Sequence, residues 1–339
     1  MKRFAKWFLL VVLVLGCLAA VAITFTIGWR PFLGPKARPL TSRTFERTPQ
    51  RLERGRYIAT ALSDCMGCHS PHEWAAPGVP MIPGKEGSGE VMPLNDVPGR
   101  IVAPNLTPDP ETGAGLWTDD QLARAIREGI GHDGRALFPL MPYTFFRHMS
   151  DEDLASVIVY LRSLPPVRNP LPATEIIFPV KYLIRGVPQP VTSPVPELAP
   201  NSDPLTRGRY LVTTAAVCAN CHTPFDKGQE IPGMTLAGGF ALSGPWGRVS
   251  AANITPDPSG ISYYDEALFL EVMRTGFVKA RKLNPIMPTS VYKNLTDDDL
   301  KAMFAYLRTL KAVHHRVDNS EPPTFCKLCR QKHGGGDQN

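Results

Sequence analysis

The stretch "SDCMGCHS", residues 63–70, places two cysteines three positions apart and a histidine directly after the second. The stretch "VCANCHTP", residues 217–224, repeats this arrangement. A nucleophilic site needs one thiol, and a redox dithiol needs no histidine at this point. Covalent haem attachment needs all three residues, because two thiols add across the porphyrin vinyl groups and the adjacent imidazole then lies below the iron. We therefore expect two covalently attached haems c, held by Cys65, Cys68 and His69 and by Cys218, Cys221 and His222.

The two motifs belong to a longer internal repeat. "RGRYIATALSDCMGCHSP" begins at Arg54, and "RGRYLVTTAAVCANCHTP" begins at Arg207. Further along, "APNLTPDPETG" matches "AANITPDPSG", and "PLMPYTFFRHMSDEDLASVIVYLRSL" matches "PIMPTSVYKNLTDDDLKAMFAYLRTL". A repeat of this length is a duplicated domain with small insertions rather than a short-period solenoid.

Each copy is expected to be helical with long loops. A short helix over residues 51–62, and its partner over 207–216, leads into the cysteines. The segment 118–129 opens with an N-capping threonine and a glutamine three residues later, which is a capping box. The last helix of each copy begins with the same kind of signal, at Ser150 and at Thr296. No segment shows sustained strand alternation, so the fold is expected to be mainly α.

These motifs resemble those of the class I c-type cytochromes, over roughly residues 50–315. The similarity is greatest to the multihaem, membrane-bound cytochrome c subunits of bacterial alcohol and gluconate dehydrogenases. Those subunits usually carry three haems, whereas this sequence has two complete C-x-x-C-H sites. The resemblance implies a mainly α architecture with two tandem class I cytochrome c domains behind an N-terminal transmembrane helix.

The expected organisation has five parts: an N-terminal anchor or signal segment (1–30), a first haem domain (45–168), a proline-rich linker (169–203), a second haem domain (204–315) and a C-terminal tail (316–339). The linker contains apolar runs such as "EIIF" and "KYLI", which are unusual in a free linker. We expect it to form an extended strap that lies across both domains and holds the haems at a fixed separation.

The N-terminus indicates export. Three positive charges precede the uncharged run from Trp7 to Gly28, which suits a membrane span of ~20 residues better than the ~7–15-residue core of a signal peptide. We expect an uncleaved single-pass anchor in the inner (cytoplasmic) membrane, with the haem domains in the periplasm. Two alternatives remain: cleavage after "AVA" at 20–22, and lipidation at Cys17, which ends "VLGC".

His69 and His222 are the expected proximal iron ligands. For the sixth position each copy offers several candidates, and the repeat favours Met141 and Met287, because each precedes a proline at the same point before the last helix. A thioether favours ferrous iron and raises the reduction potential. The alternative is that both methionines only fill gaps in the core.

Two further pairs follow from the resemblance. The carbonyls of Pro71 and Pro224, two residues after each histidine, would accept from the ligand's other ring nitrogen. Asn105 and Asn253 open the "TPD" loops, which in the family pack beside the haem edge and its propionates. The alternative for the asparagines is an ordinary turn residue.

The expected function is electron transfer rather than catalysis, and no catalytic residue is assigned. A membrane-tethered dihaem cytochrome would carry single electrons between redox protein partners: a donor such as a dehydrogenase subunit, and an oxidase or soluble carrier. The alternatives are a dihaem peroxidase, which needs one iron open to peroxide, and a zinc-binding structural module. The net charge is +6, but the basic residues are scattered along the chain and form no cluster that would indicate nucleic-acid binding.

The tail "CKLCRQKHGGGDQN" carries a third C-x-x-C pair, but Arg330 stands where a haem-binding histidine would be. A third covalent haem is therefore not expected. Cys326 and Cys329 either form a local disulfide or remain unengaged in a frayed tail, and a metal site that includes His333 is the further alternative.

Overall fold

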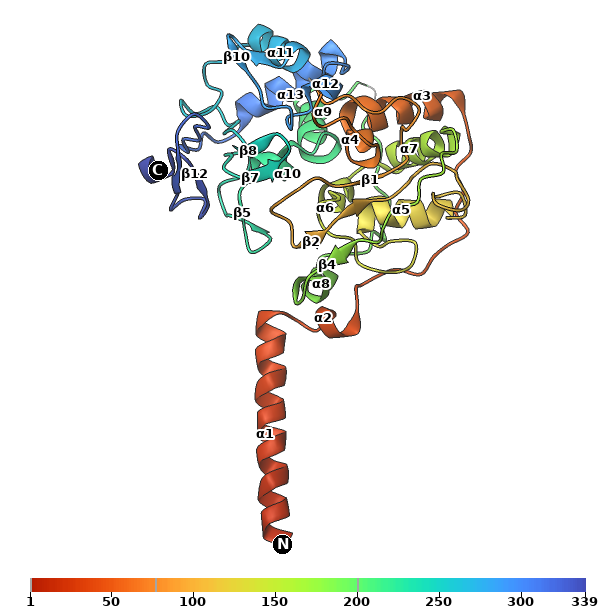
Figure 1. The fold of residues 1–339 in the computed structure, drawn as a ribbon, viewed down its shortest axis with the longest axis vertical. Coiled ribbons are helices and arrows are strands. Elements are labelled where there is room, and N and C mark those ends of the chain that lie inside the picture. The colour runs from red at the N-terminus through yellow and green to blue at the C-terminus, as the bar shows by residue number, and fades with distance from the viewer. Residues whose placement is uncertain (1, 77, 200) are drawn as a thin grey trace.

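The structure is a computed structural model that describes residues 2–76, 78–199 and 201–339. Two helical domains lie side by side, and the long helix α1 (Lys2–Thr26) extends away from them (Figure 1). The helices of the first domain are α3 (Pro49–Tyr57), η1 (Ile58–Leu62), α4 (Cys65–His69), α5 (Asp119–Glu128), α6 (Tyr143–Phe146) and α7 (Asp151–Ser163). The second domain repeats this order with α9 (Pro204–Tyr210), η3 (Leu211–Ala215), α10 (Cys218–His222), α11 (Glu266–Thr275), α12 (Thr289–Tyr292) and α13 (Asp297–Thr309).

The strands are short and pair only as two-stranded antiparallel ribbons within the described ranges. They are β1 (Glu90–Val91) with β3 (Val102–Ala103), β2 (Gly99–Arg100) with β4 (Glu175–Ile176), β5 (Phe225–Asp226) with β6 (Gln229–Glu230), β7 (Ala241–Gly244) with β8 (Gly247–Ser250), β9 (Phe277–Val278) with β10 (Arg281–Lys282), and β11 (Pro323–Phe325) with β12 (Lys332–Gly334). The mainly α fold expected from the sequence is confirmed.

The helix starts expected from the sequence are present. Thr118 and Gln121 form a complete capping box at α5, in which each side chain bonds the other residue's backbone. Ser150 and Thr296 cap α7 and α13 by accepting from the amides of Asp153 and Asp299, respectively.

In each domain the first helix packs closely on the last. Gly55 of α3 and Gly208 of α9 make this possible, since a Cβ at either position would lie 1.9 Å from a backbone oxygen, that of Ser156 in α7 or Ala302 in α13. Glycine is required at both positions because it lets one helix backbone approach the other. The shared "RGRY" sequence therefore fixes the same helix pair in both copies.

Helix α1 is long and apolar enough to cross a membrane, by length and composition, and none of its most apolar stretch is buried in the described part of the chain. The short helix α2 (Arg30–Leu33) follows and packs on α8 (Val180–Leu183) and η2 (Ile184–Gly186) of the linker. Arg185 donates to the Pro31 carbonyl at 3.0 Å. The linker thus holds the segment that leaves the long helix.

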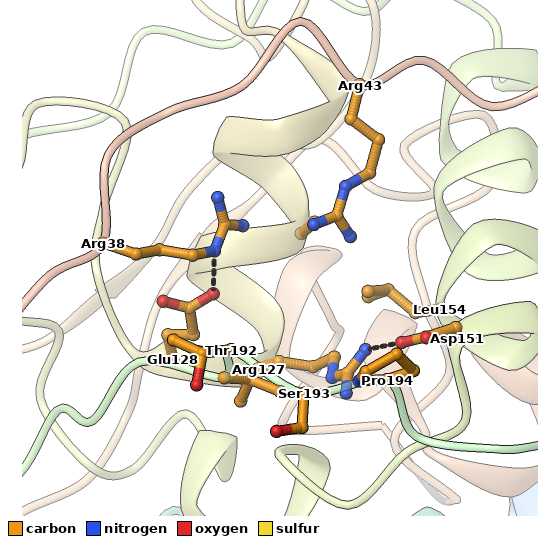
Figure 2. A pocket seen from close by; sticks show the side chains of 11 residues that line it. Arg38, Arg43, Arg127, Glu128, Asp151, Leu154, Thr192, Ser193 and Pro194 are labelled. Atoms are coloured by element: carbon orange, nitrogen blue, oxygen red, sulfur yellow. Dashed lines mark hydrogen bonds and ion pairs between the residues drawn. The ribbon is translucent and has the colours of Figure 1, made fainter.

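The linker packs on the first domain and on the N-terminal segment, and its expected contact with the second domain stays a prediction. Strand β4 pairs with β2, and the Val195 carbonyl accepts from the amide of Asp151. A polar pocket lies where this linker, the N-terminal segment and helices α5 and α7 meet (Figure 2). There Arg38 pairs with Glu128 at 2.7 Å, and Arg127 pairs with Asp151. The Arg38 ion pair thus holds the N-terminal segment on the first domain, and hydrogen bonds between Asp151 and Val195 hold the linker there. None of the haem-attachment residues lines this pocket.

The two domains contact each other through a reciprocal pair of hydrogen bonds. The Tyr57 hydroxyl of the first domain donates to Asp299 of the second at 2.5 Å, and the Tyr210 hydroxyl of the second donates to Asp153 of the first at 2.6 Å. Both carboxylates are buried. Burial and the Asp299 carboxylate raise the pKa of Tyr57 to about 12, so the phenol remains a donor at neutral pH.

Each of these aspartates also pairs with an arginine of its own domain, Arg54 with Asp153 at 2.7 Å and Arg207 with Asp299 at 2.6 Å. The arginine, glycine and tyrosine of "RGRY" thus have separate structural roles. Buried residues of both domains form one continuous hydrophobic cluster around this interface. The domains are therefore joined by shared core as well as by polar contacts.

We predict that Tyr57→Phe and Tyr210→Phe each lower the free energy of unfolding by about 1–3 kcal/mol, because each removes a hydrogen bond to a buried charged carboxylate. Chemical denaturation of the solubilised protein measures this. Tyr306→Phe is the matched control, since the Tyr306 hydroxyl has no hydrogen bond within the described part of the chain. Equal stability of all three variants would show that the reciprocal contacts contribute nothing.

Candidate haem sites

Each C-x-x-C-H motif forms a five-residue helix, α4 or α10, that follows a π-helical turn. The residue before the first cysteine has a left-handed backbone, with φ of 48° at Asp64 and 46° at Val217. A left-handed backbone is uncommon for residues other than glycine, and both it and the π-helical turn are typical of functional sites. The same distortion in both copies turns the chain sharply, so that the motif helix leaves the direction of the preceding helix.

The proximal histidines are oriented by backbone carbonyls. The Nδ1 atom of His69 lies 2.8 Å from the Pro104 oxygen, and that of His222 lies 2.7 Å from the Ala252 oxygen. A carbonyl only accepts, so Nδ1 carries the proton and Nε2 is left with a free lone pair, as an iron ligand requires. Burial lowers the pKa of both imidazoles, which keeps them neutral.

The assignment of Pro71 and Pro224 as the orienting carbonyls was wrong. Their oxygens accept instead from the amides of Ile82, at 2.9 Å, and Ile231, at 3.1 Å, in the loops that follow each motif. The carbonyls that orient the histidines come from the residues just before Asn105 and Asn253. The sequence signal for them was the repeated "N-[LI]-T-P-D-P" loop itself.

Asn105 and Asn253 anchor these loops. The Oδ1 atom of Asn105 accepts from the amide and hydroxyl of Thr107, and its Nδ2 donates to the Val167 carbonyl at 2.7 Å. Asn253 makes the same bonds to Thr255 and to the Val313 carbonyl, at 2.8 Å. Both side chains are almost completely buried. Their role in this structure is to hold the carbonyl that orients the histidine, and contact with haem propionates stays a prediction.

The candidate methionines differ in burial. Met149, Met234 and Met273 are buried in packing, whereas Met81, Met92, Met141 and Met287 are half-buried. Of the half-buried ones, Met141 and Met287 lie in turns of the same form, each directly before a short helix, α6 or α12, that packs on the π-helical turn of the other domain. The equivalence of the two positions is consistent with iron ligation, which stays a prediction.

The two attachment motifs adjoin across the domain interface. The hydroxyl of Ser63, two residues before Cys65, donates to the Ala215 carbonyl, three residues before Cys218, at 2.8 Å. The buried Tyr292 has a pKa raised well above its ordinary value, by burial and then by groups of both motifs, including Cys218 and Asp64. The haem-binding residues of the two domains therefore lie near one another.

The residues present fit covalently bound haem. The four motif cysteines are unpaired, and none of them is fully buried. Each motif ends in an imidazole whose Nδ1 is already engaged, so Nε2 is the nitrogen available to iron. Haem bound in this way carries one electron at a time as its iron changes between the ferric and ferrous states.

We predict that Asn253→Ala and Asn105→Ala lower the stability of the haem protein by about 1–3 kcal/mol or more, because buried polar groups of the loop lose their partners. Thermal unfolding followed through the haem absorbance measures the loss. Asn95→Ala, at an exposed position of the first domain, is the control. An unchanged melting profile in the buried variants would contradict the anchoring role.

The comparisons with known proteins agree with this geometry. The "Cytochrome c" family model matches residues 52–165 and 205–311, one match in each domain. The chain is 31% identical over 327 residues to a nicotinate dehydrogenase subunit of Pseudomonas putida, an alignment that covers 91% of this chain and 25% of that protein. It is 30% identical over 275 residues to the cytochrome c subunit of alcohol dehydrogenase (quinone) of Gluconobacter oxydans, covering 77% of this chain and 55% of that subunit.

The chain thus spans a quarter to about half of the length of these two relatives. A shorter relative is the diheme cytochrome c-type protein of Cereibacter sphaeroides, which is 32% identical over 227 residues, covering 63% of this chain and 73% of that protein. Both family matches contain a complete C-x-x-C-H motif. The chain therefore belongs to the cytochrome c family, with two tandem cytochrome c domains that carry two covalently bound haems c.

Proposed function

We propose that this protein is an electron-transfer cytochrome that passes single electrons from a dehydrogenase outside the cytoplasm to a respiratory acceptor, an oxidase or a soluble carrier. The observation that carries the proposal is the contact between the two haem-attachment motifs, at Ser63 and Ala215. Electron tunnelling falls steeply with distance, so adjoining haems form a path through the protein. The relatives named as cytochrome subunits of alcohol, fructose and gluconate dehydrogenases support a dehydrogenase as donor.

Met141 and Met287 are proposed as the sixth iron ligands. Support comes from their equivalent turns and their half-buried positions at the edge of the core. With a methionine on each iron, neither haem has an open position for substrate. This arrangement favours a carrier over the peroxidase alternative, which needs one iron open to peroxide, and the relatives named above give the peroxidase no support.

Membrane anchoring through α1 is the second part of the proposal. The helix carries no charge from Trp7 to its end at Thr26 and extends away from both domains (Figure 1). An uncleaved helix of this kind would hold both haem domains close to the membrane surface, where membrane-bound dehydrogenases and oxidases exchange electrons.

The ligand assignment predicts the optical spectrum of the oxidised protein. Met141→Leu and Met287→Leu should each remove roughly half of the methionine-to-iron band at the red end, since two haems contribute to it, and should lower the potential of the affected haem. Leucine has a similar volume and leaves the packing intact. Met92→Leu, at another half-buried methionine, is the control. If the band survives in the double variant, neither methionine is an iron ligand and both only fill gaps in the core. A high-spin haem in the unaltered protein would favour the peroxidase.

The anchor is tested by fractionation and by the intact mass of the purified protein. We expect the haem protein in the membrane fraction with α1 retained, and release of a spectrally unchanged protein when a cleavable signal replaces residues 1–28. A mature chain that begins after Ala22 would show a cleaved signal, and an acylated chain that begins at Cys17 would show a lipoprotein.

A further inference from the structure

Four metal-ligating side chains gather where the tail packs on the second domain. They are His315, Cys326, Cys329 and His333, and each is at most 1% exposed. Their ligand atoms all lie within 4.8 Å of one another. The expectations for the tail were wrong in two respects: the two cysteines are free thiols, not a disulfide, and they are buried in an ordered hairpin, not in a frayed segment.

The hairpin of β11 and β12 carries three of these residues, Cys326, Cys329 and His333. Cys326 directly follows β11, and its amide bonds the Gln331 carbonyl at 2.8 Å, which closes the turn. The Cys329 amide points at the Cys326 sulfur at 3.5 Å, and Arg330 has a left-handed φ of 55°. His333 lies in β12. The backbone thus folds both thiols toward the same point as the imidazole of the opposite strand.

The hydrogen bonds of the two imidazoles determine which nitrogens face inward. The Nδ1 atom of His315 lies 2.7 Å from the Ala237 carbonyl, and that of His333 lies 3.0 Å from the Gly334 carbonyl. Both Nδ1 atoms must carry protons, because a carbonyl only accepts. The Nε2 atoms of the two histidines then direct their lone pairs at each other across 3.1 Å. The Cys326 sulfur lies 3.4 Å from the Nε2 atom of His315. A Cys326 thiol could donate to only one of these nitrogens, whereas a cation between them would accept both lone pairs at once.

We propose that His315, Cys326, Cys329 and His333 form a tetrahedral Cys₂His₂ site for a structural zinc ion. Zn–N bonds of about 2.0–2.1 Å and Zn–S bonds of about 2.3 Å separate the ligands of a tetrahedral site by about 3.3–3.8 Å. The two Nε2 atoms, 3.1 Å apart, and the Cys326 sulfur and the His315 Nε2, 3.4 Å apart, lie within a few tenths of an ångström of that range, and all the ligand atoms lie within 4.8 Å of one another. Two thiolates balance the two charges of Zn²⁺, so the filled site is neutral and suited to full burial.

The first domain shows why the site exists only in the second copy. Asn169 occupies the position equivalent to His315: its side chain donates to the Ser88 carbonyl at 2.9 Å, as His315 donates to that of Ala237. The backbone amides also correspond, since that of Asn169 bonds the Thr112 hydroxyl and that of His315 bonds the Ser259 hydroxyl. The Asn169 amide therefore makes the equivalent hydrogen bond to a backbone carbonyl without any metal. The histidine of the second domain makes the same bond and has, in addition, an Nε2 atom that faces the other ligands.

A glycine, Gly239, covers one side of the four ligands. Gly239 has a left-handed φ of 93°, and a Cβ there would lie 2.6 Å from the His315 ring and 3.3 Å from the Cys329 sulfur. The loop of Gly239 thus closes directly over the ligands, which leaves the site dry. The proposed metal site is also connected to the second haem site. The Asn253 side chain donates to the His315 carbonyl, and the preceding residue, Ala252, accepts from the His222 ring and orients it.

The test is metal analysis of the full-length, detergent-solubilised haem protein, with haem iron as the internal standard. We expect one zinc for every two irons. His315→Asn, which copies the arrangement of the first domain, should reduce zinc at least tenfold while both haems and their spectrum are retained. The double variant Cys326→Ser, Cys329→Ser should do the same, and His132→Asn and Cys17→Ser, at exposed positions, should keep the full zinc content.

Alkylation separates the other possibilities. With zinc bound, Cys326 and Cys329 should react with iodoacetamide under denaturing conditions after a chelator and without any reductant. Reaction only after a reductant would establish a disulfide and overturn the proposal. Zinc below one tenth of an equivalent in the unaltered protein after growth in zinc-replete medium, or more than two irons per chain, would overturn it as well.

Discussion

A haem that is bound through two cysteines three positions apart is tethered at one edge, and its iron is held by one imidazole. The loops around each motif keep that imidazole in place. The left-handed residue before the motif turns the chain, and the carbonyl of Pro104 or Ala252 sets the plane of the histidine. The buried asparagine next in sequence then holds that carbonyl. Loss of any part would free the imidazole to rotate, so the asparagine loop is as much a part of the site as the motif.

The duplication gives the molecule a further constraint. Each domain contributes a tyrosine that bonds an aspartate buried in the other, and each aspartate lies in the first turn of the last helix of its own domain. The helix that leads into each cysteine motif is thus held near its C-terminal end, by a glycine contact inside the domain and by a tyrosine contact across the interface. This geometry brings the two motifs together through contacts made by the domains themselves.

The sequence predicted the features that depend on local chemistry. The C-x-x-C-H motifs, the repeat, the capping boxes and the helical class were all evident, because each is encoded within a few residues. The partner of the histidine was missed because the carbonyl of Pro104 lies 35 residues from His69 along the chain and approaches only after folding. The tail was misjudged for a similar reason. His315 completes the ligand set from the other side of a loop, and a C-x-x-C pair outside the cytoplasm favours a disulfide when it is judged by spacing alone.

The shared interface also bears on how the protein unfolds and how it can vary. Because one hydrophobic cluster spans both domains and each half completes a buried carboxylate of the other, neither half has a finished core by itself. We expect the two domains to melt in a single cooperative transition, with no stable one-haem intermediate. A substitution in the shared core would then lower the stability of both haem domains, whichever domain carries it.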